Sequence, residues 1–320
     1  MRYSRQIVFE KIGVEGQEKI NGTNVTILGL GAIGSKSAEL LTRAGIGSLT
    51  LIDRDIVEES NLQRQSLFTE EDINQPKALV AKARLEKINS NTKIRAFFKD
   101  INNKNIEDYV RPAMALDCTD NMQTRFLLNE FCFKEKIPWI YTAIIESTGM
   151  LFSIMPEKTP CLTCIFNEIN QPLDSCDVSG IINTIAPLAS SIQATEAIKY
   201  IINKPTTKEL LYFDVWKNKI EKIKVKKQIG CPTCNSRFSY INGKKTNDAI
   251  KLCGTNSYQI QGPKLKLKEV AGKLEKIDKV ILNDYCLIFK DLTIFSDGRV
   301  LIKAPNDKQA RSAYTKYIGY

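Results

Sequence analysis

A glycine-rich turn near the start of the chain is the first feature whose residue types could do chemistry. Gly29, Gly31 and Gly34 have the spacing of a nucleotide-binding fingerprint. In that fingerprint the first glycine permits a tight turn, the second lets the backbone approach a phosphate, and the third lets a helix pack closely on a strand. The N-terminus of the following helix favours an anion. The turn therefore predicts a phosphate-binding loop.

An acidic residue after the turn is compatible with two kinds of nucleotide chemistry. Asp53 ends the expected strand 48–52, where its carboxylate could accept hydrogen bonds from ribose hydroxyls. The turn and Asp53 by themselves are also typical of a nicotinamide-dependent oxidoreductase. That alternative stays open at this point.

Two cations farther along the chain favour a triphosphate over a dinucleotide. Arg64 lies in the segment 61–65 (NLQRQ), and Lys77 begins an expected helix. When ATP is cleaved between its first and second phosphates, charge develops on the leaving pyrophosphate, and a guanidinium fork and an ammonium group would stabilise it. The alternative is that each is an ordinary surface cation.

Asp120 follows the expected strand 113–117, at the strand end where open α/β sheets bind ligands. Its carboxylate could hold a Mg²⁺ ion that bridges phosphate oxygens. In the alternative, Thr119 or Asp120 caps the helix that begins near residue 121.

The cysteines predict a metal site. Cys161 with Cys164 and Cys231 with Cys234 form two Cys-x-x-Cys pairs, and four thiolates suit a tetrahedral Zn²⁺. Four protein ligands leave no open position, so the zinc is expected to be structural; two separate redox pairs are the alternative. The remaining cysteines outside the segment 174–180 are interpreted as packing residues, namely Cys118, Cys132, Cys253 and Cys286.

Composition excludes several classes of function. The 320 residues contain no histidine, which excludes histidine general bases and histidine-ligated zinc. No segment approaches the ~20 apolar residues of a membrane helix, and no signal peptide precedes the first turn, so a cytoplasmic protein is expected. The net charge of +10 comes from lysines and arginines spread along the chain, with no nucleic-acid motif.

The hydrophobic pattern predicts an α/β protein with a Rossmann-like open sheet, mostly parallel and with an antiparallel extension. Residues 1–240 are expected to form this domain with its four-cysteine zinc site, and 245–320 a small α+β C-terminal appendage. The expected helices are 32–44, 77–88, 121–134, 191–199, 270–274 and 307–317. The expected strands are 24–28, 48–52, 113–117, 138–145, 149–155, 210–215, 220–225, 280–283, 286–289, 292–296 and 300–303.

An ordered set of motifs resembles one known family. The set comprises segments 2–6 (RYSRQ), 13–17 (GVEGQ), 29–34, 53–55 (DRD), 61–65, 75–77 (QPK) and 117–121 (DCTDN), followed by the two cysteine pairs. Over about residues 1–237 the chain is similar to the ThiF/MoeB/HesA adenylyltransferases of thiamine and molybdopterin-synthase biosynthesis, relatives of the ubiquitin-activating enzymes. After Gly180 it departs from the family pattern at Thr184, Pro187 and Ser190, which leaves the path of this loop open.

The resemblance implies a reaction and its participants. A ubiquitin-like sulfur-carrier protein would present its C-terminal Gly-Gly carboxylate to ATP and Mg²⁺, giving an acyl-adenylate and pyrophosphate. A sulfurtransferase or cysteine desulfurase is a further candidate partner. Molybdopterin, thiamine and tRNA-thiolation pathways all remain open, as does the conjugation of a ubiquitin-like protein. A binding module that has kept the fold without catalysis is a further alternative.

The resemblance also implies residue roles. Asp53 would hold the ribose, the side chains of Asn61, Arg64 and Lys77 the phosphates, and Asp120 the Mg²⁺. Arg5 would reach into the site of a neighbouring protomer, making a homodimer necessary. Cys176 would form a persulfide or a covalent link with the carrier, although Asp174 and Asp177 would raise its thiol pKa, and a non-essential loop thiol is the alternative. The nucleotide-binding set is completed by Gly29, Gly31, Gly34, Asp55, Gln65 and Asn121.

Overall fold

The computed structural model describes residues 2–166, 180–245, 249–252 and 257–319. Cys176 and Cys253 lie outside this part of the chain. The described residues separate into two compact units: one takes in residues up to 166 together with 180–244, and the other the described residues from 245 onward.

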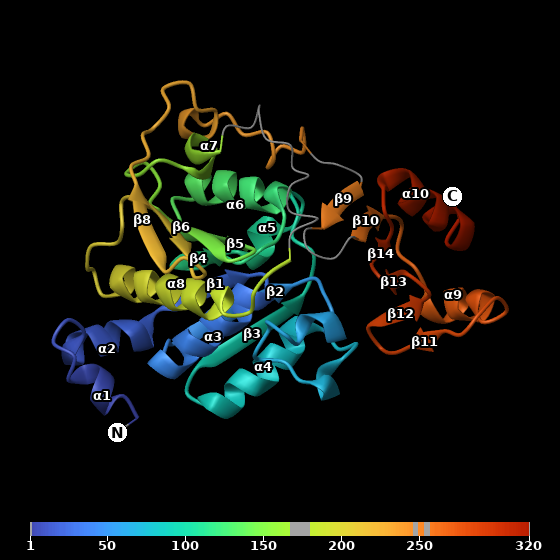
Figure 1. Ribbon diagram of the computed structural model, residues 1–320, viewed down its shortest axis with the longest axis horizontal. Coiled ribbons are helices and arrows are strands. Elements are labelled where there is room, and N and C mark those ends of the chain that lie inside the picture. Colours follow the sequence, from blue (N-terminus) through green and yellow to red (C-terminus); the bar gives the residue numbers. More distant parts are fainter. Residues whose placement is uncertain (1, 167–179, 246–248, 253–256, 320) are drawn as a thin grey trace. The chain divides into compact units, whose positions relative to one another are not determined.

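The first unit contains an eight-stranded sheet among its described residues (Figure 1). The strand order is β3-β2-β1-β4-β5-β6-β7-β8. The five strands β1 to β5 are parallel to one another. Strands β6, β7 and β8 each pair antiparallel with the preceding strand. This confirms the predicted open sheet with its antiparallel extension. The strands are β1 (Asn24–Leu28), β2 (Ser48–Asp53), β3 (Lys93–Phe98), β4 (Met114–Asp117), β5 (Trp139–Ile145), β6 (Thr148–Ile154), β7 (Leu210–Asp214) and β8 (Lys219–Ile223).

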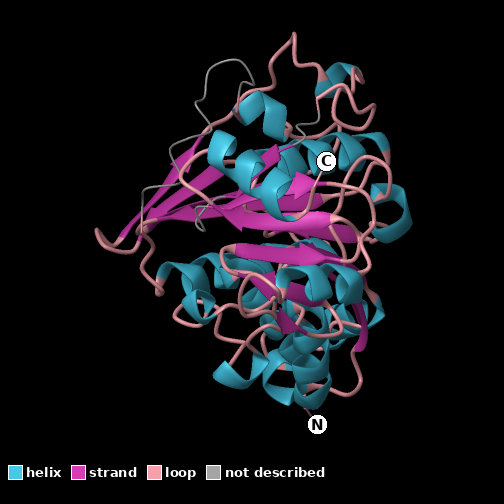
Figure 2. Ribbon diagram, turned by 90° about the vertical axis from the view of Figure 1, so that its right-hand side faces the viewer, coloured by secondary structure: helices cyan, strands magenta, loops and turns pink. Residues whose placement is uncertain are grey.

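Helices cover both faces of this sheet (Figure 1). One face carries the apolar sides of α3 (Ala32–Ala44), α4 (Lys77–Ile88) and α8 (Ile185–Ile201). The other carries α6 (Met122–Lys134), whose Phe126, Leu127 and Phe131 pack against Trp139 of β5. The shorter helices are α1 (Ser4–Ile7), α2 (Gly13–Gly22), α5 (Ile106–Tyr109) and α7 (Leu162–Ile165), with single 3₁₀ turns at Glu59–Asn61, Glu70–Asp72 and Thr233–Asn235. Figure 2 distinguishes the strands from the flanking helices by colour.

Helix α8 is longer than the sequence predicted. It begins at Ile185 instead of residue 191, so Pro187 and Ser190 lie inside it and Thr184 is its N-cap residue. Proline is tolerated here because the first backbone N–H groups of a helix have no intrahelical acceptor. The Ser190 hydroxyl donates to the carbonyl of Ile33, 2.9 Å away, and so joins α8 to α3.

The second unit is a six-stranded antiparallel sheet, in the order β11-β12-β13-β14-β10-β9 among its described residues. Its core includes Leu287, Phe289, Ile294 and Ile302, which pack with Ala310 of the last helix. The sequence analysis missed β9 and β10 here, as it missed α1, α2, β3, α5 and α7 in the first unit. The elements are β9 (Ala249–Leu252), β10 (Ser257–Gln261), α9 (Leu267–Leu274), β11 (Ile281–Leu282), β12 (Cys286–Phe289), β13 (Leu292–Phe295), β14 (Arg299–Lys303) and α10 (Asp307–Tyr317).

No helix in the described part of the chain combines the length and hydrophobicity needed to span a bilayer. The cysteines Cys118, Cys132 and Cys286 are buried. Burial raises the pKa of each of these thiols, to about 11 for Cys286. Their interpretation as packing residues is therefore confirmed.

Candidate active site

The glycine turn joins β1 to α3, and its three glycines have different surroundings. Gly29 has φ +85, and a Cβ there would come within 2.5 Å of the carbonyl oxygen of Cys118. A Cβ on Gly34 would lie 1.9 Å from the Gly29 oxygen, so α3 can start this close to the strand only with glycine. A Cβ on Gly31 would meet only the side chain of Gln65, at 3.7 Å. Gly31 is thus the glycine whose backbone has room beside it.

Asp53 ties the end of β2 to this turn. Its carboxylate accepts hydrogen bonds from the backbone N–H of Leu30 and, at 2.6 Å, from that of Asp55. Burial raises the pKa of Asp53 to about 6, with a further contribution from the charge on Asp55, while Lys77 and the two N–H groups act in the opposite direction. A carboxylate has about four acceptor positions, so lone pairs remain for a ribose.

Lys77 is held beside these carboxylates. It is the first residue of α4, its side chain is 7% exposed, and its Nζ lies 3.6 Å from Asp55 Oδ2. A buried ammonium group needs a partner, so the alternative of an ordinary surface cation is wrong for Lys77.

The segment 61–65 forms a compact turn after Ile56 and Val57. Asn61 and Gln65 are buried, and Asn61 Oδ1 accepts from the backbone N–H of Glu58 at 3.3 Å. Gln65 Oε1 is buried without a hydrogen-bond partner in the described part of the chain. Because Gln65 lies beside Gly31, this orphaned acceptor belongs to the same site as the glycine turn.

Arg64 is half-buried and donates from Nη1 to the carbonyl of Ser60 at 2.9 Å. Burial lowers its pKa, partly offset by Glu58. The described residues offer no salt-bridge partner for Arg64. The guanidinium is therefore available to an anion from outside the chain.

Asp120 follows β4, and its side chain is 44% exposed. It does not cap the next helix: the side chain of Asn121 does, accepting from the backbone N–H of Thr124 at 2.8 Å. The alternative in which Thr119 or Asp120 is the N-cap is therefore wrong, because the helix begins one residue later and the Thr119 hydroxyl donates instead to Asp117, at 2.6 Å. This leaves the Asp120 carboxylate without a capping role.

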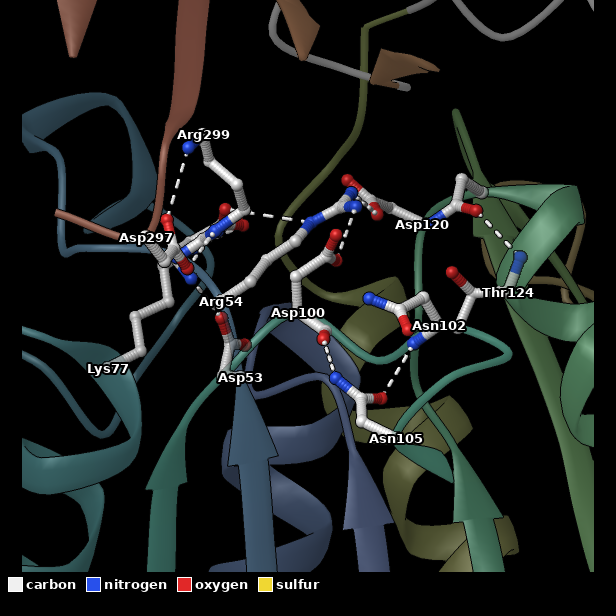
Figure 3. A network of polar contacts seen from close by, with 12 residues as sticks. Asp53, Arg54, Lys77, Asp100, Asn102, Asn105, Asp120, Thr124, Asp297 and Arg299 are labelled. Carbon is white, nitrogen blue, oxygen red and sulfur yellow. Dashed lines mark hydrogen bonds and ion pairs between the residues drawn. The ribbon is translucent and has the colours of Figure 1, made fainter. Parts of the chain in front are cut away.

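A cation missed by the sequence analysis lies among the aspartates of the site. Arg54 is 9% exposed, with Nη1 3.2 Å from Asp100, Nη2 3.3 Å from Asp120 and Nε 3.8 Å from Asp55 (Figure 3). Burial lowers the pKa of Arg54, but Asp100, Asp120 and Asp55 raise it by more, so the guanidinium stays charged. The DRD motif at 53–55 was the available signal, but only its aspartates were considered.

A buried glutamine connects the elements beneath the site. Gln193 of α8 donates from Nε2 to the Asp117 carbonyl at 3.1 Å and to Thr142 Oγ1 at 2.9 Å. Its Oε1 accepts from Ser37 Oγ at 2.6 Å and from Cys118 Sγ at 3.3 Å. Helices α3 and α8 are thereby fixed to the end of β4 and to the middle of β5, which sets where the glycine turn and Asp120 stand.

Arg5 does not join this group of residues within the described chain. It is exposed on α1. Val8, Phe9 and Val14, which follow it, are 77%, 54% and 62% exposed. Cys176 lies outside the described residues, and its role stays a prediction.

The four predicted metal ligands do converge. The sulfurs of Cys161, Cys164, Cys231 and Cys234 all lie within 4.8 Å of one another, with separations such as 3.5 Å between Cys161 and Cys231. Four thiolates about 2.3 Å from a central Zn²⁺ would be separated by ~3.8 Å. Hydrogen bonds from Cys161 and Cys234 lower the pKa of Cys164, whereas burial raises that of Cys231. Four adjacent sulfurs can all be thiolates only beside a cation, so the donor set fits a metal ion.

A polar cluster joins the two cysteine loops to α6. The hydroxyls of Thr163 and Thr233, one inside each Cys-x-x-Cys pair, lie 2.9 Å apart. Asn129 of α6 donates to both, at 3.1 and 3.3 Å, and accepts from the backbone N–H of Leu162 at 2.9 Å. The loops are therefore held together by protein groups as well as by their sulfurs.

The fold and the site define a nucleotide-binding α/β protein with a four-cysteine site. The chain belongs to the ThiF family, which matches residues 3–233. It is 37% identical to the sulfur carrier protein ThiS adenylyltransferase of Bacillus subtilis, over 99% of both chains. The Escherichia coli protein of the same name is 36% identical and covers 73% of this chain and 94% of its own length. The predicted family is thus confirmed.

A further relative agrees with this assignment, and a solved structure agrees with the fold. The molybdopterin-synthase adenylyltransferase of Salmonella typhimurium is 31% identical, over 73% of this chain and 96% of its own. The crystal structure of E. coli MccB with ATP superposes with a TM-score of 0.65 at 24% identity, covering 73% of each chain. At that identity the likeness supports the fold alone.

Proposed function

We propose that this chain adenylates the C-terminal Gly-Gly carboxylate of a ubiquitin-like sulfur-carrier protein. The observation that carries the proposal is the similarity to the B. subtilis ThiS adenylyltransferase along 99% of both chains. The two alternatives, a nicotinamide-dependent oxidoreductase and a non-catalytic module, do not account for the charged residues of the site. Neither needs Arg64, Lys77 and Asp120 around the glycine turn. The carrier would serve the thiamine, molybdopterin or tRNA-thiolation pathway.

The reaction is a displacement at phosphorus. An oxygen of the carrier carboxylate forms a bond to the α-phosphorus of ATP, the bond from that phosphorus to the bridging oxygen breaks, and pyrophosphate leaves with the electron pair. The attacking carboxylate is already ionised, so no general base is needed, and positioning with charge stabilisation supplies the catalysis.

In this proposal the nucleotide lies over the glycine turn. Asp53 and Asp55 hold the ribose end, and Gly31 leaves room for phosphate to approach the backbone beside the Gln65 amide, whose Nε2 lies 3.7 Å from the Cβ position of Gly31. Arg64 is the partly buried cation available for the leaving pyrophosphate. Lys77 binds phosphate from the start of α4 and Asn61 from the 3₁₀ turn before it, and Asn121 closes the far end at the N-cap of α6.

Mg²⁺ would neutralise phosphate charge beside Asp120, whose carboxylate is half-exposed and faces the site. Zn²⁺ in the four-cysteine cluster would hold the two loops together as a structural ion. Such a site needs reduced thiols, which fits the predicted cytoplasmic location.

The carrier is proposed to dock along β8. This strand is at the edge of the sheet, all five of its residues are exposed, and Trp216 and Ile220 are 75% and 62% exposed. Lysines gather around these apolar groups, at Lys217, Lys219, Lys222, Lys224, Lys226 and Lys227. An edge strand can pair with a strand of a partner, and the lysines favour an acidic carrier.

A homodimer is proposed on the basis of the N-terminal helices. Arg5 is accompanied by exposed Val8, Phe9 and Val14, which are apolar side chains that a second copy would bury. Arg5 would then reach the phosphates of the partner's nucleotide. A cysteine desulfurase or sulfurtransferase would act afterwards on the acyl-adenylate, and Cys176 is the candidate for a covalent link at that stage.

The decisive experiment is ATP–pyrophosphate exchange. Radioactive pyrophosphate is expected to enter ATP only when a Gly-Gly-ending carrier is present, and not with the same carrier lacking its last glycine. Arg64→Ala is expected to reduce exchange at least about a hundredfold, in line with the loss of one preorganised charge-stabilising group. Exchange that is independent of any carrier, or NAD-dependent reduction in its place, would refute the proposal.

A further inference from the structure

One buried guanidinium stands between two carboxylates at the edge of the proposed nucleotide site. Arg54 directs Nη1 toward Asp100 at 3.2 Å and Nη2 toward Asp120 at 3.3 Å (Figure 3). The side chains of Arg54 and Asp100 are 9% and 15% exposed, whereas that of Asp120 is 44% exposed. Asp120 is therefore the member of this group that can reach a ligand from solvent.

The guanidinium is fixed by carboxylates other than Asp120. Asp100 approaches Nη1, and Asp55 lies 3.8 Å from Nε. A buried planar guanidinium that is hydrogen-bonded to Asp100 and has a second carboxylate near Nε has little freedom to follow Asp120. Arg54 thus presents a stationary positive charge to the Asp120 carboxylate.

We propose that Arg54 is a positioning residue that makes the divalent-cation site at Asp120 depend on bound nucleotide. The inference rests on the proposed magnesium role of Asp120. In the absence of nucleotide, Arg54 supplies the positive charge that Asp120 would otherwise take from a metal ion. With nucleotide present, phosphate oxygens add the negative charge and the ligands that let Mg²⁺ share Asp120 with the guanidinium.

The chemistry of the group explains this dependence. Carboxylate oxygens are the ligands that Mg²⁺ prefers, and Asp100 and Asp120 on either side of one cation would form a divalent site if that cation were removed. Because unit charges a few ångströms apart interact strongly when partly buried, replacing Arg54 by a neutral residue should strengthen metal binding about tenfold or more. The enzyme would then bind metal without its substrate.

Manganese titration followed by electron paramagnetic resonance tests the proposal, since only free Mn²⁺ gives the sharp six-line signal. The full chain is titrated with and without an ATP analogue that has a non-cleavable bridge between its α- and β-phosphates. The unmodified chain should bind one Mn²⁺ at this site only with the analogue. Arg54→Gln should bind Mn²⁺ without the analogue. Its dissociation constant should then be at least about tenfold lower than that of the unmodified chain without the analogue.

Two variants serve as matched controls. Arg54→Lys keeps a positive charge and should restore nucleotide dependence. Arg54→Gln combined with Asp100→Asn removes one ligand of the new site and should abolish nucleotide-independent binding. Equal Mn²⁺ binding by the unmodified chain with and without the analogue would overturn the proposal. A folded Arg54→Gln variant that binds Mn²⁺ no more tightly than the unmodified chain in the absence of the analogue would also overturn it.

If Arg54→Gln does not fold, Asp100→Asn decides the matter. With Asp100 neutral, a larger share of the guanidinium charge acts on Asp120, so nucleotide-dependent Mn²⁺ binding should weaken about threefold or more. Unchanged or tighter binding would contradict the proposal. The exchange assay on the unmodified chain separates the two ideas, because a failed exchange with intact nucleotide-dependent Mn²⁺ binding removes the proposed reaction and leaves the role of Arg54.

Discussion

At the scale of single residues, the site is governed by buried charges that are partly compensated. Asp53 and Lys77 are buried, and both lie next to Asp55. The pKa of Asp53 therefore depends on its burial and on the charges of Asp55 and Lys77. Arg64 differs, because it is half-buried and hydrogen-bonds only to a backbone carbonyl among the described residues. Its charge is left for the substrate.

Asp53 should give nucleotide binding a pH dependence. Its pKa is raised to about 6, so below that pH the folded protein carries a neutral carboxyl, which is a poorer acceptor for ribose hydroxyls. We expect ATP affinity to fall about tenfold between about pH 7 and pH 5. Calorimetric titrations across this range would measure it.

Asp53→Asn is the control for this prediction. Its uncharged amide cannot titrate, so the variant should bind ATP more weakly at neutral pH and show only the pH dependence of ATP itself. The same profile for both proteins would assign the effect to ATP and not to Asp53.

At the scale of elements, polar residues buried between helices and strands set the shape of the site. Gln193 is completely buried, and its four partners come from α3, β5 and the end of β4. Asn129 does the same for the two cysteine loops and α6. A buried polar group of this kind stabilises one arrangement because any other leaves donors or acceptors unpaired.

Gln193→Met should destabilise the first unit. The variant keeps the approximate volume of the side chain but leaves the hydroxyls of Ser37 and Thr142 and the Asp117 carbonyl without this partner, at about 1–3 kcal/mol for each buried group left unpaired. We expect a loss of roughly 2–4 kcal/mol in the free energy of unfolding and a raised KM for ATP. Urea denaturation would measure the first effect. Thr195→Ala, at an exposed position of the same helix, should change stability by less than about 0.5 kcal/mol.

Asn129→Leu should loosen the four-cysteine site without touching a ligand. The variant removes the hydrogen bonds to Thr163 and Thr233, so the two loops would be held chiefly through the metal. Supporting groups of this kind typically change metal affinity about ten- to a hundredfold, and we expect zinc release to a chromophoric chelator to be faster by about that factor. A release rate equal to that of the unmodified protein would count against this role.

At the scale of the whole molecule, the chain consists of a family unit followed by a second compact unit. The ThiF family match ends at residue 233, and the described residues separate at 244–245. The E. coli relative covers 73% of this chain and 94% of its own length. A protein of this family can thus exist largely without the region that follows residue 244.

A chain ending at residue 244 should therefore keep carrier-dependent exchange, within about threefold of the full-length rate, because we propose that all the groups acting on ATP lie before that point. Circular dichroism would establish that the shortened chain is folded. A folded but inactive chain would show that residues after 244 contribute to the reaction.

The predictable parts of the fold were those with strong local signals. Strand 24–28 and helix 32–44 match the structure because a β-branched run ends at a glycine turn and an amphipathic period follows. Strands β9 and β10 were missed, since segments of mixed polarity such as Ser257–Gln261 become strands only by pairing with neighbours. The start of helix α8 was predicted too late, at residue 191 instead of Ile185, because Pro187 was interpreted as a loop residue.

The sequence by itself determined the chemical inventory: three glycines in a fingerprint, two cysteine pairs and the ordered charged motifs that define the family. Only the tertiary structure decided which charges meet. Arg54 reaches Asp100 and Asp120 from the end of a different strand, and Gln193 reaches Asp117 from α8. Local sequence patterns record spacing along the chain, whereas contacts of this kind depend on how strands are ordered in the sheet and on which side chains must find partners once buried.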